Sequence, residues 1–322
     1  MTASVSKWIQ LEQPRLGTRV TYATDEFFAA KERIIDPADP VFIADKYDDH
    51  GKWMDGWESR RRRVPGHDYC VIRLGVPGII HGFDIDTSYF TGNFPPQASI
   101  EACSSDLDVP EDGWVELVPK TKLAGDSHHY LDVRDDRTWS HVRLHIYPDG
   151  GIARLRIFGE IKADFTDVDG YVDLAAVEHG GRAIACSDEH YGSMHNLTAP
   201  GRGINMGDGW ETARRRGPGN DWVIIALGKP GVIERAEIDT AHFKGNYPDR
   251  VSIEGGNFDS DEQAANAGQG WRTLLPESKL KMDQQHYFDE NLEDIGAISH
   301  VRVSIYPDGG VSRVRLFGQV HG

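Results

Sequence analysis

The chain has 322 residues, of which 39% are hydrophobic and 10% aromatic, and its formal net charge is −16. The length indicates two domains, and the apolar content argues against a disordered chain. The negative net charge argues against nucleic acid or an anionic membrane as a partner, because phosphate groups need Lys and Arg to neutralise them. A small anion held by a local Arg cluster is compatible with this charge.

The sequence carries no sign of a secreted or membrane protein. Residues 1–17, MTASVSKWIQLEQPRLG, lack the apolar core of a secretory signal. No stretch approaches the roughly 18 to 20 apolar residues of a membrane span. The three cysteines, Cys70, Cys103 and Cys186, lack CxxC spacing, which argues against a disulfide framework and a thiolate zinc site. We therefore expect a soluble cytoplasmic protein.

The predicted elements appear in the same order twice. Three blocks align without gaps between the copies: 8–29 with 171–192, 56–78 with 209–231, and 140–161 with 299–320. The offset falls from 163 to 153 between the first two blocks, so the first copy has ten extra residues before its Gly-Trp, around ERIIDPADP. The polar segment ADFTDVDG (163–170) suits a short linker. We predict domains at 1–165 and 166–322.

Each copy consists of short predicted strands. The apolar run YCVIRLG (69–75) ends in Gly, and WVIIALG (222–228) is its copy. Later, HVRLHIY (141–147) and ARLRIFG (153–159) alternate apolar and polar residues at period two, as half-buried strands do. PDGG between them is a turn, in which Pro presets φ and Gly accepts a positive φ. The best helix candidate, DEFFAAKERII (25–35), is short. We predict an all-β fold of two tandem jelly-roll β-sandwich domains related by internal duplication.

One duplicated segment combines turn residues with polar side chains. IDTSYFTGNFP (85–95) returns as IDTAHFKGNYP (238–248). We expect its Phe in the core and its Gly-Asn in a turn. Its polar members are also candidates for binding a substrate: Asp86, Thr87 and Asn93, with the copies Asp239, Thr240 and Asn246. Because a duplicated fold needs its turns in both copies, the structural and the binding interpretations both stay open.

Several motifs occur in a fixed order: TDE or SDE with an aromatic residue, GWE before an Arg run, IDTxxFxGNxP, and SHVR…PDGG…RxRxFG. Doubled over residues 8–320, this set resembles the allantoicase family, and its order is similar to the jelly-roll of galactose-binding and discoidin-like domains. The resemblance implies a hydrolase of purine breakdown, in the degradation of allantoin, that converts allantoate to ureidoglycolate and urea. We also expect a homo-oligomer that needs no cofactor.

The implied substrate sets chemical requirements for the site. Release of intact urea breaks the bond between the central carbon and a ureido nitrogen, so a general acid and a general base are needed, each worth about 10²–10⁴ in rate. The candidate acids and bases are Asp25, Glu26, Glu101 and His129, with the copies Asp188, Glu189, Glu254 and His286. The substrate carboxylate needs a cation, for which the candidates are Arg61 and Lys122, with the copies Arg214 and Lys279.

Each candidate has a structural alternative. The carboxylates can cap turns, and most of the Arg run 60–63 can serve solubility, because at most alternate residues of an extended segment point one way. Spacing such as HExxH is absent, so we predict no obligatory metal, although His128 and His129 leave one open. The sequence does not decide which repeat carries an active site. The alternative functions are a non-catalytic tandem carbohydrate- or ligand-binding module of discoidin type, and a structural scaffold.

Overall fold

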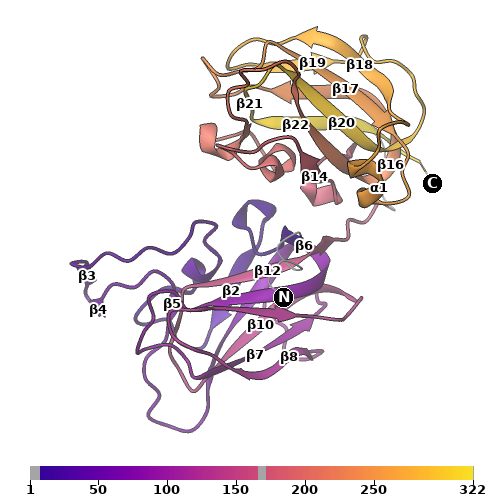
Figure 1. Ribbon diagram of the computed structural model, residues 1–322. Coiled ribbons are helices and arrows are strands. Elements are labelled where there is room, and N and C mark those ends of the chain that lie inside the picture. Colours follow the sequence, from indigo (N-terminus) through magenta and orange to yellow (C-terminus); the bar gives the residue numbers. More distant parts are fainter. Residues whose placement is uncertain (1–7, 166–171, 322) are drawn as a thin grey trace. The chain divides into compact units, whose positions relative to one another are not determined.

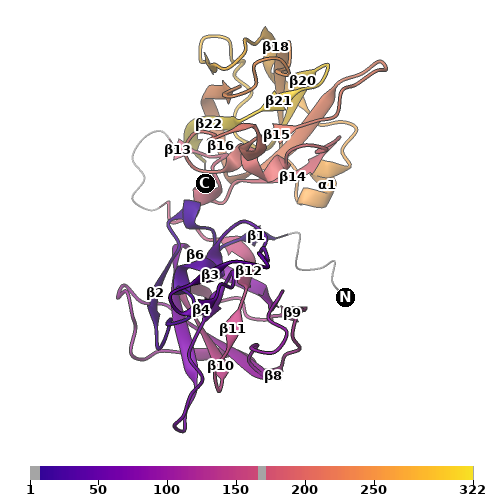
Figure 2. The same cartoon turned by 90° about the vertical axis from the view of Figure 1, so that its left-hand side faces the viewer.

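The computed structural model describes residues 8–165 and 172–321. It divides into two compact units, Met1–Lys162 and Ala163–Gly322 (Figures 1 and 2). The boundary predicted at 165/166 adjoins residues 166–171, which lie outside the described part of the chain. The all-β prediction is confirmed, since α1 (Asp261–Ala265) is the one α-helix among the described residues. No described helix is long and apolar enough to span a membrane.

The first unit is built almost entirely from antiparallel strands. They are β1 (Ile9–Gln10), β2 (Arg19–Ala23), β3 (Tyr47–Asp48), β4 (Gly51–Lys52), β5 (Trp57–Glu58), β6 (Asp68–Asp86), β7 (Gln97–Cys103), β8 (Val115–Lys122), β9 (His128–Asp132), β10 (Thr138–Tyr147), β11 (Gly151–Ile152) and β12 (Arg154–Ile161). Two 3-10 helices, η1 (Pro14–Leu16) and η2 (Lys31–Ile35), complete it. The best helix candidate of the sequence, residues 25–35, contains only the 3-10 helix η2.

The long strand β6 contributes to both layers of the sandwich. Its first half pairs with β2 and β10, and its second half pairs with β9 and β12. The register slips at the Gly-Val-Pro-Gly stretch 75–78, where the partner of Trp139 is Gly78 and the partner of His141 is Arg73. One layer is therefore β2-β6-β10-β7-β8 and the other is β1-β12-β6-β9. This arrangement is the predicted jelly-roll.

The core follows from the period-two pattern. Cys70, Ile72 and Leu74 of β6 are buried, as are Leu144 and Ile146 of β10. These side chains point to the same face of one layer and pack against the other layer. At roughly 25 cal/mol per Å² of buried apolar area, such residues supply most of the favourable free energy of folding.

The second unit repeats this topology. Its strands are β13 (Val172–Asp173), β14 (Arg182–Cys186), β15 (Trp210–Glu211), β16 (Asp221–Asp239), β17 (Arg250–Gly256), β18 (Arg272–Lys279), β19 (Gln285–Phe288), β20 (Ile298–Tyr306), β21 (Gly310–Val311) and β22 (Arg313–Val320). Three 3-10 helices, η3 (Val177–His179), η4 (Met194–Thr198) and η5 (Met206–Asp208), lie between strands. The strand order β13-β22-β16-β20-β17-β18 matches that of the first unit.

Two turns of each unit pack directly against each other. In the first unit, the amide of Gly151 in the PDGG turn donates to the carbonyl of Asn93, at 2.8 Å. Gly150 has φ +139°, and a Cβ there would lie 2.7 Å from the backbone nitrogen of Pro95. Phe90 of the duplicated motif is fully buried beside this contact, as expected from the sequence. The fold thus fixes the Gly-Asn turn and the PDGG turn at one end of the sandwich.

Candidate functional site

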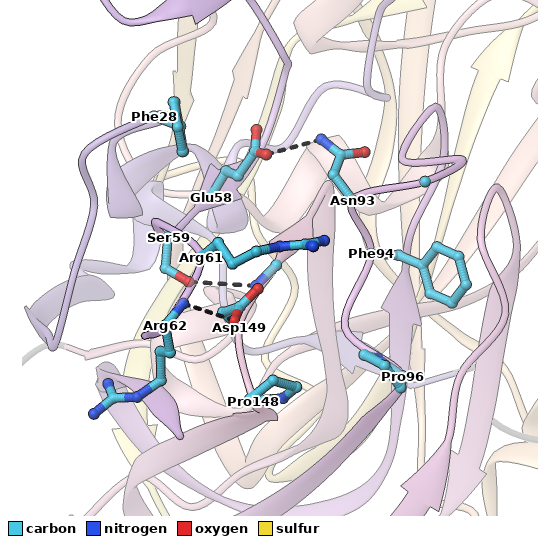
Figure 3. Close-up of a pocket in the computed structure, with 12 residues that line it drawn as sticks. Phe28, Glu58, Ser59, Arg61, Arg62, Asn93, Phe94, Pro96, Pro148 and Asp149 are labelled. Carbon is cyan, nitrogen blue, oxygen red and sulfur yellow. Dashed lines mark hydrogen bonds between the residues drawn. The ribbon is translucent and has the colours of Figure 1, made fainter. Parts of the chain in front are cut away.

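A pocket of about 520 Å³ opens where these turns meet in the first unit (Figure 3). Three segments form most of its lining: the GWE stretch with its Arg run, the Gly-Asn turn, and the PDGG turn. The lining residues are Phe28, Glu58, Ser59, Arg61, Arg62, Gly92, Asn93, Phe94, Pro96, Pro148, Asp149 and Gly150. This size lies within the roughly 300–1,000 Å³ of common small-molecule sites.

Glu58 and Asn93 form the polar centre of the pocket. The short pairing of β5 with β11 places Glu58 opposite Gly151, and Asn93 Nδ2 donates to Glu58 Oε1 at 2.8 Å (Figure 3). Burial raises the pKa of the Glu58 carboxyl, and the hydrogen bond from Asn93 offsets only part of this increase. A carboxyl of this kind can carry a proton closer to neutral pH than an ordinary Glu, which suits a general acid.

The Arg run alternates between structural contacts and the pocket. Arg60 pairs with Asp25 at 2.6 Å, and Arg62 pairs with the buried Asp68 at 2.6 Å. Between them, Arg61 is exposed, and among the described residues its guanidinium makes no hydrogen bond or ion pair. Figure 3 shows the Arg61 side chain extending across the pocket toward the loop of Asn93. An unpaired guanidinium in a small polar pocket is suited to binding a carboxylate.

Two hydrogen bonds hold the segment that carries Arg61. The amide of Arg62 donates to Asp149 Oδ2 at 2.8 Å, and the amide of Ser59 donates to the carbonyl of Gly150 at 3.1 Å. These bonds join the Arg run to the PDGG turn. The position of Arg61 is therefore determined by the same turn that packs against Asn93.

The second unit keeps the corresponding residues. Asn246 Nδ2 donates to Glu211, and the amide of Arg215 donates to Asp308 Oδ2 at 2.8 Å. Arg214 corresponds to Arg61 and is also exposed. The structure thus brings together two of the residues predicted from the sequence, Arg61 and Asn93, and places their copies in equivalent positions of the second unit.

Glu58 and Glu211 were not among the sequence candidates. Both belong to the GWE motif that occurs in the two copies. Their position in the site depends on the β5–β11 and β15–β21 pairings, which join segments about 100 residues apart. The repeated Glu after Gly-Trp was the sequence feature that could have identified both residues.

Asp25 and Asp188 bind the backbone just after β5 and β15, the strands that carry Glu58 and Glu211. Asp25 accepts hydrogen bonds from the backbone N–H of Arg60 at 2.9 Å and from its Nε at 2.7 Å. Burial raises the pKa of Asp25, but the hydrogen bonds from Arg60 and Phe27 outweigh it and lower the pKa overall. Asp188 accepts from the amide of Ala213 at 2.6 Å. These contacts favour a structural role for both.

Glu26 and Glu189 bind the start of the following 3-10 helices. Glu26 accepts from the amide of Lys31 at 3.1 Å, and Glu189 accepts from the amide of Met194 at 3.0 Å. Each carboxylate thus satisfies an N-terminal amide of η2 or η4, which is a capping function.

Glu101 lies on β7 and is not among the residues that line the pocket, and Glu254 lies at the corresponding place on β17. Glu101 accepts from Arg143 Nε at 2.9 Å, and Glu254 accepts from Arg302 Nε at 2.8 Å. Burial raises the pKa of Glu101, but hydrogen bonds from His145 and Arg143 lower it below its ordinary value. An ion-paired carboxylate with a lowered pKa is a poor proton donor.

His129 and His286 use both ring nitrogens for backbone contacts. His129 Nε2 accepts from the amide of Ala124 at 2.9 Å, and its Nδ1 bonds the carbonyl of Ile85 at 2.8 Å. His286 makes the same two bonds, at 2.8 and 3.0 Å. Donation to a carbonyl and acceptance from an amide fix a neutral tautomer, so these rings tie a loop to the sheet.

The remaining candidates are divided between turns and the surface. Asp86 accepts from the amide of Ser88 at 2.7 Å, and Thr87 donates to the carbonyl of Ala124 at 2.8 Å. Both side chains are buried, as are those of Asp239 and Thr240. Lys122 is exposed at the end of β8, and Lys279 pairs with Asp249 at 2.6 Å. Among the described residues, no group of three or more His, Cys, Asp or Glu is arranged to hold a metal ion.

Comparisons with known proteins show which proteins this chain is similar to. A family model described as an allantoicase repeat matches residues 9–162 and again residues 172–321. A probable allantoicase 2 of Burkholderia pseudomallei is 53% identical over 99% of this chain and 96% of its own length. A probable allantoicase of Ralstonia nicotianae is 54% identical over 97% of this chain and 95% of its own length. The crystal structure of allantoicase from Saccharomyces cerevisiae superposes with a TM-score of 0.82 at 37% identity, over 97% of this chain and 93% of that one.

Proposed function

The chain belongs to the allantoicase family, and we propose that it hydrolyses allantoate to ureidoglycolate and urea in the pocket of Glu58, Arg61 and Asn93. One observation carries the choice of this pocket. A guanidinium with no partner among the described residues and a half-buried carboxyl with a raised pKa line the same small cavity. Allantoate presents one carboxylate and two ureido groups, which match these partners. The binding-module alternative has no support from relatives that share nearly the full chain and carry an allantoicase name.

The chemistry is assigned to groups of the pocket. Arg61 binds the substrate carboxylate, and Asn93 orients Glu58 and offers its amide oxygen to a ureido N–H. Protonated Glu58 donates its proton to the leaving ureido nitrogen. The bond from that nitrogen to the central carbon breaks, and the electron pair stays on the nitrogen of urea.

The second half of the reaction regenerates Glu58. The lone pair of the remaining ureido nitrogen forms a C=N bond to the central carbon as urea leaves. A water molecule then adds its oxygen to this carbon, and the Glu58 carboxylate takes the proton that the water loses. One carboxyl thus acts as general acid and then as general base, with each function worth about 10²–10⁴ in rate.

Glu58→Gln tests this assignment, because the amide keeps the shape of the side chain and cannot donate a carboxyl proton. We expect kcat to fall by about 10² or more, with an unchanged melting temperature. Activity of the Gln variant within a few fold of wild type would remove Glu58 from the mechanism. Glu116→Gln, on β8 outside the pocket, is the control and should leave kcat unchanged.

We propose a homo-oligomer that assembles through the segment inserted in the first repeat. Val41, Phe42, Ile43 and Tyr47 of this segment are 44–69% exposed, which is unusual for neighbouring apolar side chains. A second copy of the chain would cover them. Light scattering on the wild type and on Phe42→Asp tests this, and an unchanged mass for Phe42→Asp would contradict the assigned interface.

We also propose a cytoplasmic location. Cys70, Cys103 and Cys186 are free thiols, which fits a reducing compartment. Cell fractionation with an antibody against the chain tests this, and recovery outside the cytoplasm would contradict it.

A further inference from the structure

The same hydrogen bonds hold the segments around the Glu–Asn pair in both repeats. Trp57 Nε1 donates to the carbonyl of Asp25 at 2.8 Å, and Trp210 Nε1 donates to that of Asp188 at 2.8 Å. The Arg run is joined to the PDGG turn by the same hydrogen bond in both units, from an Arg amide to an Asp carboxylate, at 2.8 Å. From these residues alone, two equivalent active sites would be expected.

The loop before the Gly-Trp is where the repeats differ. Its two ends are bound alike. Arg154 donates to the carbonyl of Ala38 at 2.9 Å and to Asp55 at 2.8 Å. Arg313 donates to the carbonyl of Gly201 at 3.2 Å and to Asp208 at 2.7 Å. Between these anchors the first unit has residues 39–54 and the second has only residues 202–207. The same gap is thus spanned by loops that differ by ten residues.

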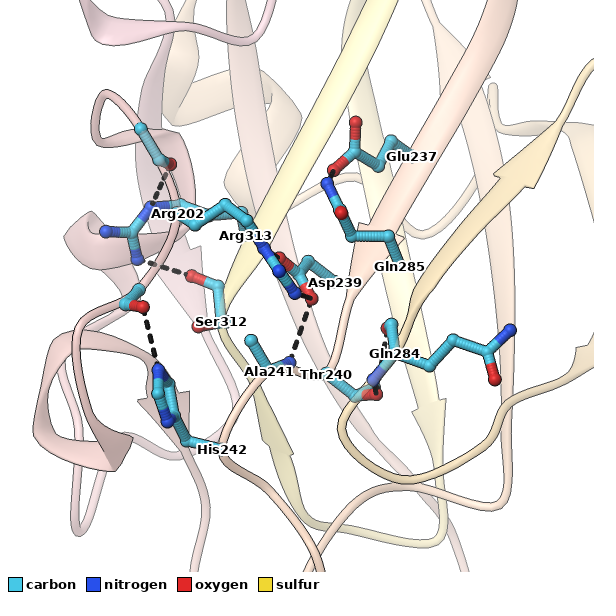
Figure 4. Close-up of polar contacts among 12 residues, drawn as sticks. Arg202, Glu237, Asp239, Thr240, Ala241, His242, Gln284, Gln285, Ser312 and Arg313 are labelled. Carbon is cyan, nitrogen blue, oxygen red and sulfur yellow. Dashed lines mark hydrogen bonds and ion pairs between the residues drawn. The ribbon is translucent and has the colours of Figure 1, made fainter.

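The short loop of the second unit is pinned by two further contacts (Figure 4). Arg202 pairs with the buried Asp239 through two hydrogen bonds, at 2.9 and 3.1 Å. His242 Nε2 bonds the carbonyl of Gly203 at 2.8 Å. In the first unit the position of Arg202 is taken by the exposed Asp39, which has the opposite charge.

This pinned loop places Met206 over the second Glu–Asn pair. Met206 Sδ lies 4.0 Å from Asn246 Nδ2, while the same nitrogen donates to Glu211. The thioether therefore lies against the amide group of the second Asn, on its nitrogen side. In the first unit, none of the residues that line the pocket of Asn93 comes from the loop 39–54. The β3–β4 hairpin of that loop extends away from the sandwich (Figure 1).

We propose that hydrolysis takes place only in the first repeat, and that Met206 closes the corresponding site of the second repeat to the substrate. In the second repeat, the role of the duplicated residues is then structural and not catalytic. These residues are Glu211, Arg214 and Asn246. This inference rests on the proposed function, because it assigns that function to one of two similar frames.

The duplication supplies matched variants for the test. Glu58→Gln and Glu211→Gln make the same change in the two frames, and the melting temperature of each variant reports folding. We expect Glu58→Gln to lower kcat by about 10² or more, and Glu211→Gln to leave it within about twofold. Equal losses in both variants would overturn the inference. If neither variant lost activity, the proposed site itself would fail, and the inference with it.

Binding stoichiometry gives a second readout that does not need turnover. Calorimetric titration of the Glu58→Gln protein with allantoate should give one molecule per chain. Adding Met206→Ala should open the second frame and raise the number toward two, and adding Asn246→Ala should return it to one. Two molecules per chain before Met206 is changed would overturn the closed second site. A number that stays at one in the Met206→Ala protein would overturn the assigned role of Met206.

Discussion

Replacement of Arg61 is the most informative single change, because we expect this side chain to contribute little to the stability of the fold. It is exposed, and among the described residues it has no hydrogen bond or ion pair to lose. Arg61→Ala should therefore leave the melting temperature unchanged. Any loss of activity can then be assigned to the lost contact between Arg61 and the substrate.

The size of the loss follows from the contact that is removed. A hydrogen-bonded interaction with a charged group contributes about 1.5–3 kcal/mol. With a factor of ten for each 1.4 kcal/mol, this predicts a decrease of about 10- to 150-fold in kcat/KM. Arg61→Lys keeps the charge but loses the planar pair of donors, so its kcat/KM should lie between those of wild type and Arg61→Ala.

The assay is the initial rate of urea release over a range of allantoate concentrations, with thermal melting of each variant. Arg62→Ala is the matched control, since it lies in the same pocket but pairs with Asp68 at 2.6 Å, a residue 1% exposed. Its loss leaves a buried carboxylate unpaired, so its melting temperature should fall. A kcat/KM for Arg61→Ala within threefold of wild type would refute the assignment of the carboxylate site.

Three further predictions concern pH and packing. Because burial raises the pKa of Glu58 and the mechanism needs its protonated form, kcat/KM should fall as the pH rises through that pKa. This decrease of kcat/KM at high pH should be absent from the residual activity of Glu58→Gln. If the decrease remained in that variant, it would belong to the titration of another group. Burial lowers the pKa of His128, but the hydrogen bond and charge of Asp84, 2.7 Å away, outweigh it and raise the pKa overall. Protonated His128 thus stabilises the folded state at low pH and loses this effect as the pH rises through the folded-state pKa. His128→Gln, the residue of the second repeat, should therefore cost more free energy of unfolding near pH 6 than near pH 8, by less than about 1 kcal/mol because the ring is half-exposed. An equal cost at both pH values would contradict the pairing. Gly151→Ala would place a Cβ 2.0 Å from the ring of Phe90 and should cost about 1–3 kcal/mol of stability. Gly92→Ala, where a Cβ would meet no atom of the described residues within 4 Å, should cost far less.

Much of the fold could be predicted from the sequence because its determinants are local. The alternation in 141–147 corresponds to buried Val142, Leu144 and Ile146 on one face of β10. The Gly-rich turns appear at the predicted places, and the duplication correctly indicates two similar units. The best helix candidate, residues 25–35, forms only the 3-10 helix η2, because Glu26 and Asp25 bind backbone amides instead of extending a helix.

The site could be predicted only in part, because it is assembled from contacts distant in sequence. Arg61 and Asn93 could be found from charge and from the duplicated motif. Glu58 could not be ranked above Asp25 or Glu101 without the pairing that sets it beside Asn93. The backbone bonds of His129 and the contact between Met206 and Asn246 likewise depend on loops that meet only in the folded chain.

The central claim is tested most directly by following urea, ureidoglycolate and ammonia together as the purified chain acts on allantoate. The proposed mechanism predicts equimolar urea and ureidoglycolate with no ammonia, because the bond at the central carbon breaks and urea leaves intact. Release of ammonia in place of urea, or no release of either product, would contradict it.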